Sequence, residues 1–143
     1  MLLTIEKIII LKSIKLFSEI SENDLLGLAT QLKEIEYAPA TEIIKEGDIG
    51  TSMYVIINGE VDVIARGEKI AKLGEKEVFG ELAALDPEPR SATIKTISDT
   101  LLFKIESALL YELISAYPNM ARSIITILCQ RIRQKNTSTQ STL

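Results

Sequence analysis

Hydrophobic and polar positions follow a helical period at both ends of the chain and a strand-like pattern between them. Residues 3–11 are densely apolar, which predicts a helix packed against the rest of the domain. The sequence Ser-Glu-Asn-Asp that begins at Ser21 is a variant of the capping box, and it predicts a second helix over residues 22–32. The apolar residues at helical spacing in this second segment are Leu25, Leu26, Leu28, Ala29 and Leu32.

The pattern changes at Ile35, because short β-rich runs then alternate with glycines and other turn residues up to Ile105. Asn58-Gly59 lies between two such runs and predicts a hairpin, since a type I′ turn needs positive φ at both central positions. Seven or eight short strands at this spacing predict a sandwich or a small barrel. The strands are expected near residues 35–37, 42–45, 52–57, 60–65, 69–73, 91–96 and 100–106.

Residues 79–94, with the sequence FGELAALDPEPRSATI, interrupt the β pattern. Residues 82–85 can form one short helical turn, and the Asp-Pro-Glu-Pro sequence that follows forces an extended or turning backbone. Gly80 permits close backbone approach, and the free N–H groups of the turn form an anion site. Arg90 adds a planar cation. We therefore expect this segment to bind a small anionic molecule.

The helical period returns in residues 107–116, stops before Pro118 and resumes over residues 119–135. In the last helix the apolar residues cover an arc of about 160°, whereas one docking face needs about 100°. Part of this arc is therefore expected to face a second subunit in a homodimer. Residues 136–143 are rich in Ser and Thr, and we expect them to be disordered.

Length and composition fit one globular domain, since the chain has 143 residues, of which 46% are hydrophobic and 25% charged. The apolar run over residues 8–11 is far shorter than the ~20 residues that span a bilayer, and we find no signal peptide. Cys129 is the single cysteine, which excludes an internal disulfide and favours a reducing compartment. A cytoplasmic location without membrane insertion is expected.

Charge and the missing histidines exclude several classes of function. The net charge is -4 and Lys and Arg form no dense block, which argues against direct DNA binding. Without histidine, Ser-His-Asp and Cys-His nucleophiles, HExxH zinc sites and imidazole-ligated metals are impossible. Ser91 has no base to activate it as a nucleophile. Chemistry that uses carboxylates or lysine alone survives this exclusion, but nothing else in the sequence supports it. We expect no enzymatic activity, no metal and no cofactor.

The segment FGELAALDPEPRSATI, placed in a roll flanked by helices, resembles the phosphate-binding cassette of the cyclic nucleotide-binding domain family. This family serves cyclic-nucleotide-regulated kinases, channels and catabolite activators. The glycines of IKEGD (residues 44–48) and YVIINGEV (residues 54–61) extend the resemblance, which covers residues 16–133.

The resemblance implies a mainly β fold with flanking helices: an antiparallel β-roll, or jelly-roll-like barrel, with N-terminal helices, a short cassette helix and C-terminal helices. Residues 1–135 would form the domain. Its helices would lie within residues 3–32 and 107–135, and its roll within residues 35–106.

The resemblance also implies a phosphate site centred on Arg90. A guanidinium can meet the two free oxygens of a cyclic phosphate with paired charge-assisted hydrogen bonds. Backbone N–H groups of Ala83 and Ala92, with the Ser91 hydroxyl, would complete this site.

By the same resemblance, Glu81 would accept a hydrogen bond from the ribose 2′-OH, and the backbone of Gly80 would contact the ribose. The last helix would close over the base as a lid, with base contacts from residues 133–137. The expected ligand-binding residues are Gly80, Glu81, Leu82, Ala83, Arg90, Ser91 and Ala92, with Val63, Leu73 and Ile94 as candidates for the apolar wall.

The implied function is regulatory: the module would bind a cyclic mononucleotide and signal by moving its C-terminal helix. Ser91 after the arginine resembles the catabolite activator version and favours cAMP over cGMP. No helix-turn-helix, kinase or channel segment is present, so the part that responds to ligand binding is expected in another protein, a dimer partner or a longer parent chain. The main alternative is a degenerate domain that acts as a protein-interaction scaffold without nucleotide, and the intact Glu81 and Arg90 count against it. A separate alternative for the site itself is that Glu81 and Arg90 form only a structural ion pair. A cupin-type enzyme is opposed by the missing histidines.

Overall fold

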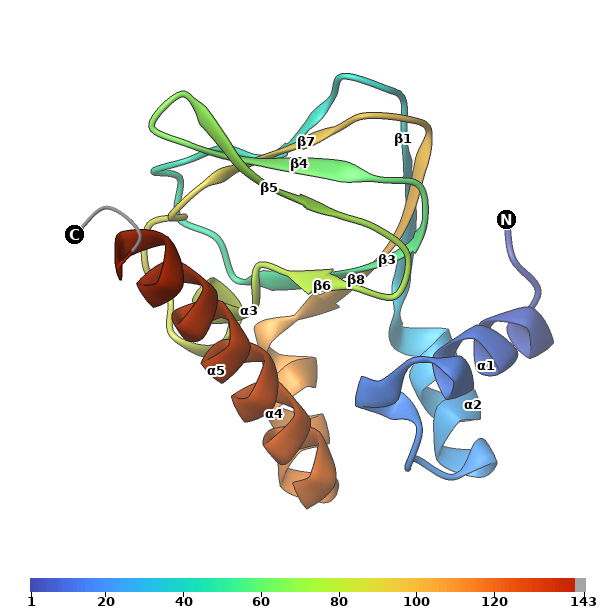
Figure 1. The fold of residues 1–143 in the computed structure, drawn as a ribbon. Coiled ribbons are helices and arrows are strands. Elements are labelled where there is room, and N and C mark those ends of the chain that lie inside the picture. Colours follow the sequence, from blue (N-terminus) through green and yellow to red (C-terminus); the bar gives the residue numbers. More distant parts are fainter. Residues whose placement is uncertain (141–143) are drawn as a thin grey trace.

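Two four-stranded antiparallel sheets face each other, and the helices gather at one side of them (Figure 1). The computed structural model describes the backbone of residues 1–140 and the side chains of residues 1–134. One sheet has the order β1-β8-β3-β6 and the other the order β2-β7-β4-β5, which confirms the expected antiparallel roll with flanking helices. The strands are β1 (Lys33–Tyr37), β2 (Glu42–Ile44), β3 (Ser52–Asn58), β4 (Val61–Ala65), β5 (Glu68–Leu73), β6 (Val78–Phe79), β7 (Thr93–Thr96) and β8 (Thr100–Glu106).

The helices precede, interrupt and follow the roll. Ser21 caps the helix that begins at Glu22 by accepting a hydrogen bond from the Asp24 N–H at 3.3 Å, as the sequence predicts. The helices are α1 (Thr4–Ser13), the 3₁₀ helix η1 (Lys15–Phe17), α2 (Glu22–Gln31), α3 (Glu81–Leu85), α4 (Ser107–Ala116) and α5 (Pro118–Gln140).

Helix α5 begins at Pro118, since proline is well tolerated at the first helical position, where its missing N–H is not needed. It continues to Gln140, past the end that we expected at Lys135. Of the segment that we expected to be disordered, residues 141–143 lie outside the described part of the chain.

Strand β3 is buried on both faces, because successive side chains point to opposite sides of a sheet. Met53 and Val55 belong to an apolar cluster between the sheet and the helices, whereas Tyr54 and Ile56 belong to a second cluster between the two sheets. This explains the continuous apolar run in the sequence, where a strand exposed on one face would alternate.

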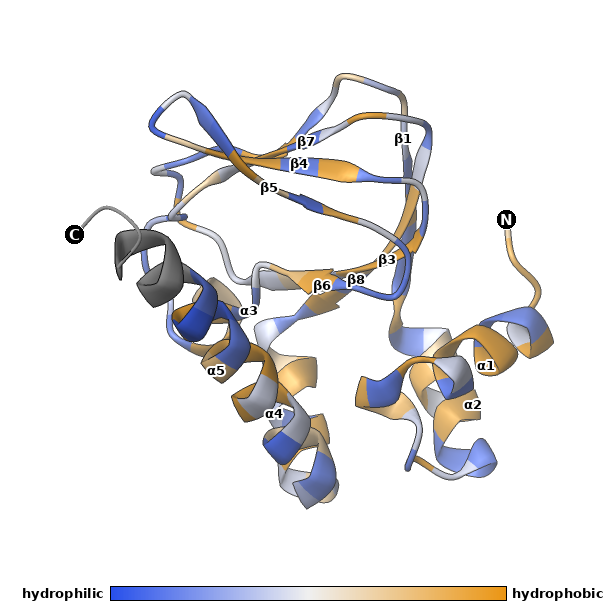
Figure 2. Cartoon of the chain, viewed as in Figure 1, coloured by the Kyte–Doolittle hydropathy of each residue, from blue (hydrophilic) through white to orange (hydrophobic). Residues whose placement is uncertain are grey.

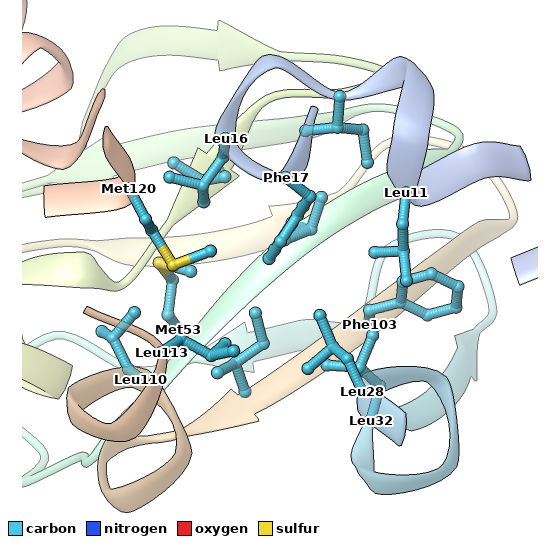
Figure 3. Packing of buried hydrophobic residues seen from close by; sticks show 14 of the residues in the cluster. Leu11, Leu16, Phe17, Leu28, Leu32, Met53, Phe103, Leu110, Leu113 and Met120 are labelled. Atoms are coloured by element: carbon cyan, nitrogen blue, oxygen red, sulfur yellow. The ribbon is translucent and has the colours of Figure 1, made fainter. Parts of the chain in front are cut away.

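The helix-side cluster joins elements from the whole length of the chain. Figure 3 shows Met53 and Phe103 of the sheet beside Leu11, Leu28 and Met120 from three helices. Figure 2 shows apolar residues on strands β3, β6 and β8 and on the neighbouring helices α1 and α2. The core therefore ties the terminal helices to the sheet that also carries one wall of the candidate site.

The predicted hairpin at Asn58-Gly59 is wrong. Strand β3 pairs with β6 and β8, whereas β4 pairs with β5 and β7, so the chain changes sheets at Gly59. Gly59 has φ +99°, but Asn58 is not among the residues with positive φ, and a type I′ turn needs both. The turn with two positive φ values is Arg66-Gly67, at 54° and 77°, which joins β4 to β5. Arginine is uncommon at positive φ, which is why the sequence did not indicate this turn.

Strand β6 was missed because two residues are too short to show an alternating pattern. It pairs with Tyr54 and Val55 of β3 and leads directly into α3. The strand expected over residues 91–96 begins only at Thr93, so Ser91 and Ala92 stay outside the ladder.

Candidate functional site

A cavity of about 390 Å³ lies between α3, the loop that follows it and the second sheet. All the residues that the sequence assigned to a ligand site line this cavity, and so do the three candidates for its apolar wall. Figure 1 shows α5 passing beside α3 at this end of the roll. The expected residues that the structure brings together here are Gly80, Glu81, Leu82, Ala83, Arg90, Ser91, Ala92, Val63, Leu73 and Ile94.

Gly80 sets the start of α3. Its φ is +81°, and a Cβ at this position would lie 2.8 Å from the Ser52 carbonyl oxygen, so only glycine fits without strain. The first helical bond runs from the Ala84 N–H to the Gly80 carbonyl at 3.2 Å. The N–H groups of Leu82 and Ala83 therefore precede the intrahelical ladder and have no acceptor within the helix.

Arg90 is 9% exposed, and over the described residues it forms no salt bridge with a carboxylate. Its Nη1 donates to the Gly80 carbonyl at 3.1 Å, and its Nη2 donates to the Ser52 carbonyl at 2.9 Å. Its backbone is also fixed, since the Arg90 N–H donates to the Asp48 carbonyl and the Gly47 N–H donates to the Arg90 carbonyl. The guanidinium is thus held in place by the main chain.

The charge on Arg90 remains uncompensated by these contacts. Burial lowers the pKa of Arg90 from its ordinary value, while Tyr54 and Glu81 oppose this change. A guanidinium stays protonated in proteins and carries about five N–H donors, so two bonds to carbonyls leave further donors for an anion.

Glu81 is 2% exposed, and its two carboxylate oxygens have different surroundings. Oε1 lies 2.7 Å from Nη1 of Arg131 in α5, and Nη2 of Arg131 also donates to the Val78 carbonyl. Oε2 is buried and has no hydrogen-bond partner among the described residues. Burial raises the pKa of Glu81, and Arg131 and then Arg90 oppose the rise. Oε2 is therefore an open acceptor for a hydroxyl group.

The suggested structural ion pair between Glu81 and Arg90 is wrong, because the partner of Glu81 is Arg131. Arg131 was not predicted from the sequence. A signal was present: Arg131 follows the buried Ile124 and the half-buried Leu128 at intervals of four and three, on one side of α5. A cation on an inward-facing side needs an acceptor, and here the acceptor is Glu81.

The base contacts expected from residues 133–137 fall largely outside the described side chains. Arg133 is exposed, and the side chains of residues 135–137 lie beyond those that the structure describes. The described contact between α5 and the cavity comes from Arg131.

Comparison with known proteins gives the family of this site. Residues 34–117 match the sequence profile described as "Cyclic nucleotide-binding domain". The chain belongs to this family. It is a family of regulatory domains, and the roll described above is its fold.

Three similar proteins show how this cyclic nucleotide-binding domain relates to longer chains. It is 32% identical over 120 residues to the mouse potassium/sodium hyperpolarization-activated cyclic nucleotide-gated channel 2, covering 84% of this chain and 14% of the channel. A cyclic nucleotide-binding domain from Methylobacillus flagellatus superposes with a TM-score of 0.73 at 26% identity, covering 98% of this chain and 82% of that one. The regulatory domain of Toxoplasma gondii PKA with cAMP gives a TM-score of 0.66 at 28% identity, covering 76% and 43%.

This cyclic nucleotide-binding domain thus spans a small part of the channels that it resembles. Over the described residues, none of its helices combines the length and the apolar character needed to cross a membrane.

We predict that Glu81→Gln stabilises the ligand-free protein near pH 7. The pKa of Glu81 is raised above 4.5, so the folded protein binds this proton more tightly than the unfolded chain, and stability falls as pH rises through that range. Glutamine removes the buried charge and keeps an acceptor for Arg131. We expect the thermal midpoint to rise by roughly 2–5 °C, since about 1 kcal/mol shifts the midpoint of such a chain by about 4 °C.

The measurement is thermal unfolding of both proteins between pH 4.5 and pH 8. The advantage of Glu81→Gln should shrink as pH falls and wild-type Glu81 becomes protonated. A gap between the two proteins that grows toward low pH would contradict the raised pKa.

Proposed function

We propose that this domain is a cytoplasmic, non-catalytic sensor that binds a cyclic mononucleotide, with cAMP as the preferred ligand. One observation carries the proposal: among the side chains of residues 1–134, a buried guanidinium without a carboxylate partner and a buried carboxylate oxygen without a donor line the same cavity. A cyclic phosphate supplies the anion that Arg90 lacks, and a ribose hydroxyl supplies the donor that Glu81 lacks. Membership of the cyclic nucleotide-binding family supports this class of ligand.

The phosphate is placed against Arg90 and the start of α3. A cyclic phosphate carries one negative charge on two free oxygens, which the remaining N–H groups of the guanidinium can meet together. The N–H of Ala83, which has no acceptor within α3, adds a neutral donor. Ser91 and Ala92 lie outside β7, so their polar groups are not committed to the ladder and complete the proposed phosphate site.

The ribose is placed against Glu81. A 2′-OH can donate to Oε2, which has no partner among the described residues, whereas a 2′-deoxy ligand would leave this buried oxygen unsatisfied. Sites built to bond a hydroxyl discriminate strongly against ligands that lack it. Preference for cAMP over cGMP rests on the resemblance of the Ser91 position to the catabolite activator version and on the Toxoplasma gondii relative solved with cAMP.

The scaffold alternative is opposed by the unfavourable free energy of burying the charged groups of this site. Burying charged groups is unfavourable when they are incompletely paired: over the described residues Arg90 has no carboxylate partner, and Glu81 is bonded to Arg131 through Oε1 but has no donor at Oε2. An interaction scaffold would be more stable with apolar residues at both positions. A bound nucleotide accounts for both groups together.

Helix α5 is proposed to report ligand binding through Glu81. Arg131 occupies Oε1 and leaves Oε2 for the ribose, so a docked α5 and a bound ligand are compatible. A docked α5 also favours ligand binding, because Arg131 of α5 neutralises the Glu81 carboxylate and fixes its orientation toward the ribose. By linkage, a ligand that gains from a docked α5 must in turn stabilise that docking.

Part of the apolar arc of α5 is exposed, and we propose that it mediates a homodimer. Ile125 and Ile132 are 60% and 59% exposed, and their spacing of two helical turns puts them on one face of α5. The half-buried Leu128 lies between them. Identical apolar stripes can pack against each other across a twofold axis.

We predict that Arg90→Ala lowers cyclic nucleotide affinity by about a hundredfold or more, because at least two charge-assisted hydrogen bonds of ~1.5–3 kcal/mol each are lost. The fold should persist, since the two hydrogen bonds described for the Arg90 side chain go to main-chain carbonyls and the backbone bonds of residue 90 are kept in the variant. Titration calorimetry with cAMP, cGMP and 2′-deoxy-cAMP measures this, with Arg122→Ala as the control because Arg122 is a cation on α5 that does not line the cavity. If the wild type shows no binding heat with either cAMP or cGMP, the scaffold alternative is favoured.

For the helix, hydrogen exchange of α5 amides is the informative measurement. Saturating cAMP should slow α5 exchange in the wild type and in Arg122→Ala, and this extra protection should be lost in Arg131→Ala. Because Arg131 is partly exposed and its ion pair is screened, we expect its removal to weaken affinity by only about three- to tenfold. An α5 whose exchange does not respond to the ligand in the wild type would contradict the coupling.

For the dimer, sedimentation equilibrium should give a mass above that of the monomer that falls on dilution. Ile125→Glu places a charge in the exposed stripe. It should raise the dissociation constant of the dimer by about tenfold or more, since burying an unpaired charge costs more than about 1.4 kcal/mol. A wild-type protein that is monomeric at all concentrations would exclude this interface.

A further inference from the structure

Gly50 lies in the loop between β2 and β3, directly against the side chain of Arg90. A Cβ built on Gly50 would lie 2.2 Å from Nε, 2.5 Å from Cζ and 2.5 Å from Nη2 of Arg90. These are the three nearest atoms, and all are closer than a Cβ ever approaches a nonbonded atom. The guanidinium therefore occupies the space in which any other residue would carry its side chain.

Gly50 differs from the other tightly packed glycines of the chain. Gly59 and Gly80 have positive φ, and a Cβ on either would meet a backbone oxygen, of Asp99 and Ser52 respectively. Gly50 has no positive φ, so its backbone conformation is open to any residue. The three nearest atoms that a Cβ on Gly50 would meet all belong to the Arg90 side chain.

We infer that Gly50 is a positioning residue for the ligand site, because its missing side chain fixes where the Arg90 guanidinium lies. This inference rests on the proposed function, in which Arg90 binds the phosphate. Nη2 is both the atom that donates to the Ser52 carbonyl at 2.9 Å and one of the three atoms that a methyl group on Gly50 would displace. The added methyl group thus removes one of the two hydrogen bonds that orient the guanidinium.

The acceptor cannot follow a displaced Arg90. Ser52 pairs with Glu106 across the ladder between β3 and β8, and its hydroxyl also donates to Oε2 of Glu106 at 2.8 Å. Lys104 lies 3.5 Å from the other oxygen of Glu106. The Ser52 carbonyl therefore stays in place, and only the flexible end of the arginine can move.

Room for that movement exists. A second cavity of about 320 Å³ is lined by Gly50, Ser52 and Arg90, and Arg90 also lines the cavity of the candidate site. The backbone of Arg90 remains bonded to Gly47 and Asp48. A methyl group on Gly50 should therefore change the placement of the guanidinium and leave the fold intact.

The test compares wild type, Gly50→Ala and Gly27→Ala. Gly27 lies in α2 with nothing within 4 Å of a built Cβ and without positive φ, so it is a matched site for one added methyl group. Thermal unfolding first shows that each variant is folded. The Nε–H resonance of Arg90, assigned by its loss in Arg90→Lys, then reports the guanidinium without any ligand, and calorimetry with cAMP reports affinity.

We expect Gly50→Ala to be folded, to move the Arg90 Nε–H resonance and to bind cAMP about tenfold or more weakly, which is the loss of one charge-assisted hydrogen bond. Gly27→Ala should match the wild type in the resonance and in affinity. An unmoved resonance, equal affinity or an unfolded Gly50→Ala would overturn the inference. Absence of both cAMP and cGMP binding by the wild type would instead overturn the proposed function, whatever the resonance does.

Discussion

A buried arginine held by main-chain carbonyls is the constraint on which the candidate site depends. The two acceptors of Arg90 come from Ser52 in β3 and from Gly80 at the start of α3, so a strand and the cassette meet at one guanidinium. Carbonyl oxygens orient the group but carry no net charge. The charge of the buried cation is therefore not neutralised by these contacts, and it is the physical reason for proposing an anionic ligand in this cavity.

Glu81 presents the complementary problem. Its carboxylate is buried, and one oxygen is bonded to Arg131 of α5 while the other has no partner in the described chain. An arrangement of this kind lowers the stability of the free domain and is worth retaining only if the open oxygen is used. Because one carboxylate lines the cavity and bonds to the helix, the proposed coupling between ligand and α5 needs no long pathway between them.

Local patterns predicted the features that are local. The cassette is contiguous, so the sequence alone was enough to place Gly80, the short helix and Arg90 together, and the cap at Ser21 needs only three further residues. Sheet pairing is not local: the residues around Asn58-Gly59 suit a hairpin, but their partners are set by strands elsewhere in the chain. Strand β6 was missed because it is too short to show an alternating pattern. Arg131 was missed because its partner, Glu81, is far away in the sequence.

The most consequential misses, Gly50 and Arg131, both lie outside the cassette. One leaves the space that the guanidinium occupies, and the other holds the carboxylate from α5. A chain could keep every residue of FGELAALDPEPRSATI, place a side chain at position 50 and still present the arginine wrongly. The cassette sequence therefore supplies the polar groups of the proposed site, whereas the β2–β3 loop and α5 set the positions of those groups in the cavity. A binding domain and a degenerate scaffold of the same fold should be distinguished at those outer positions first.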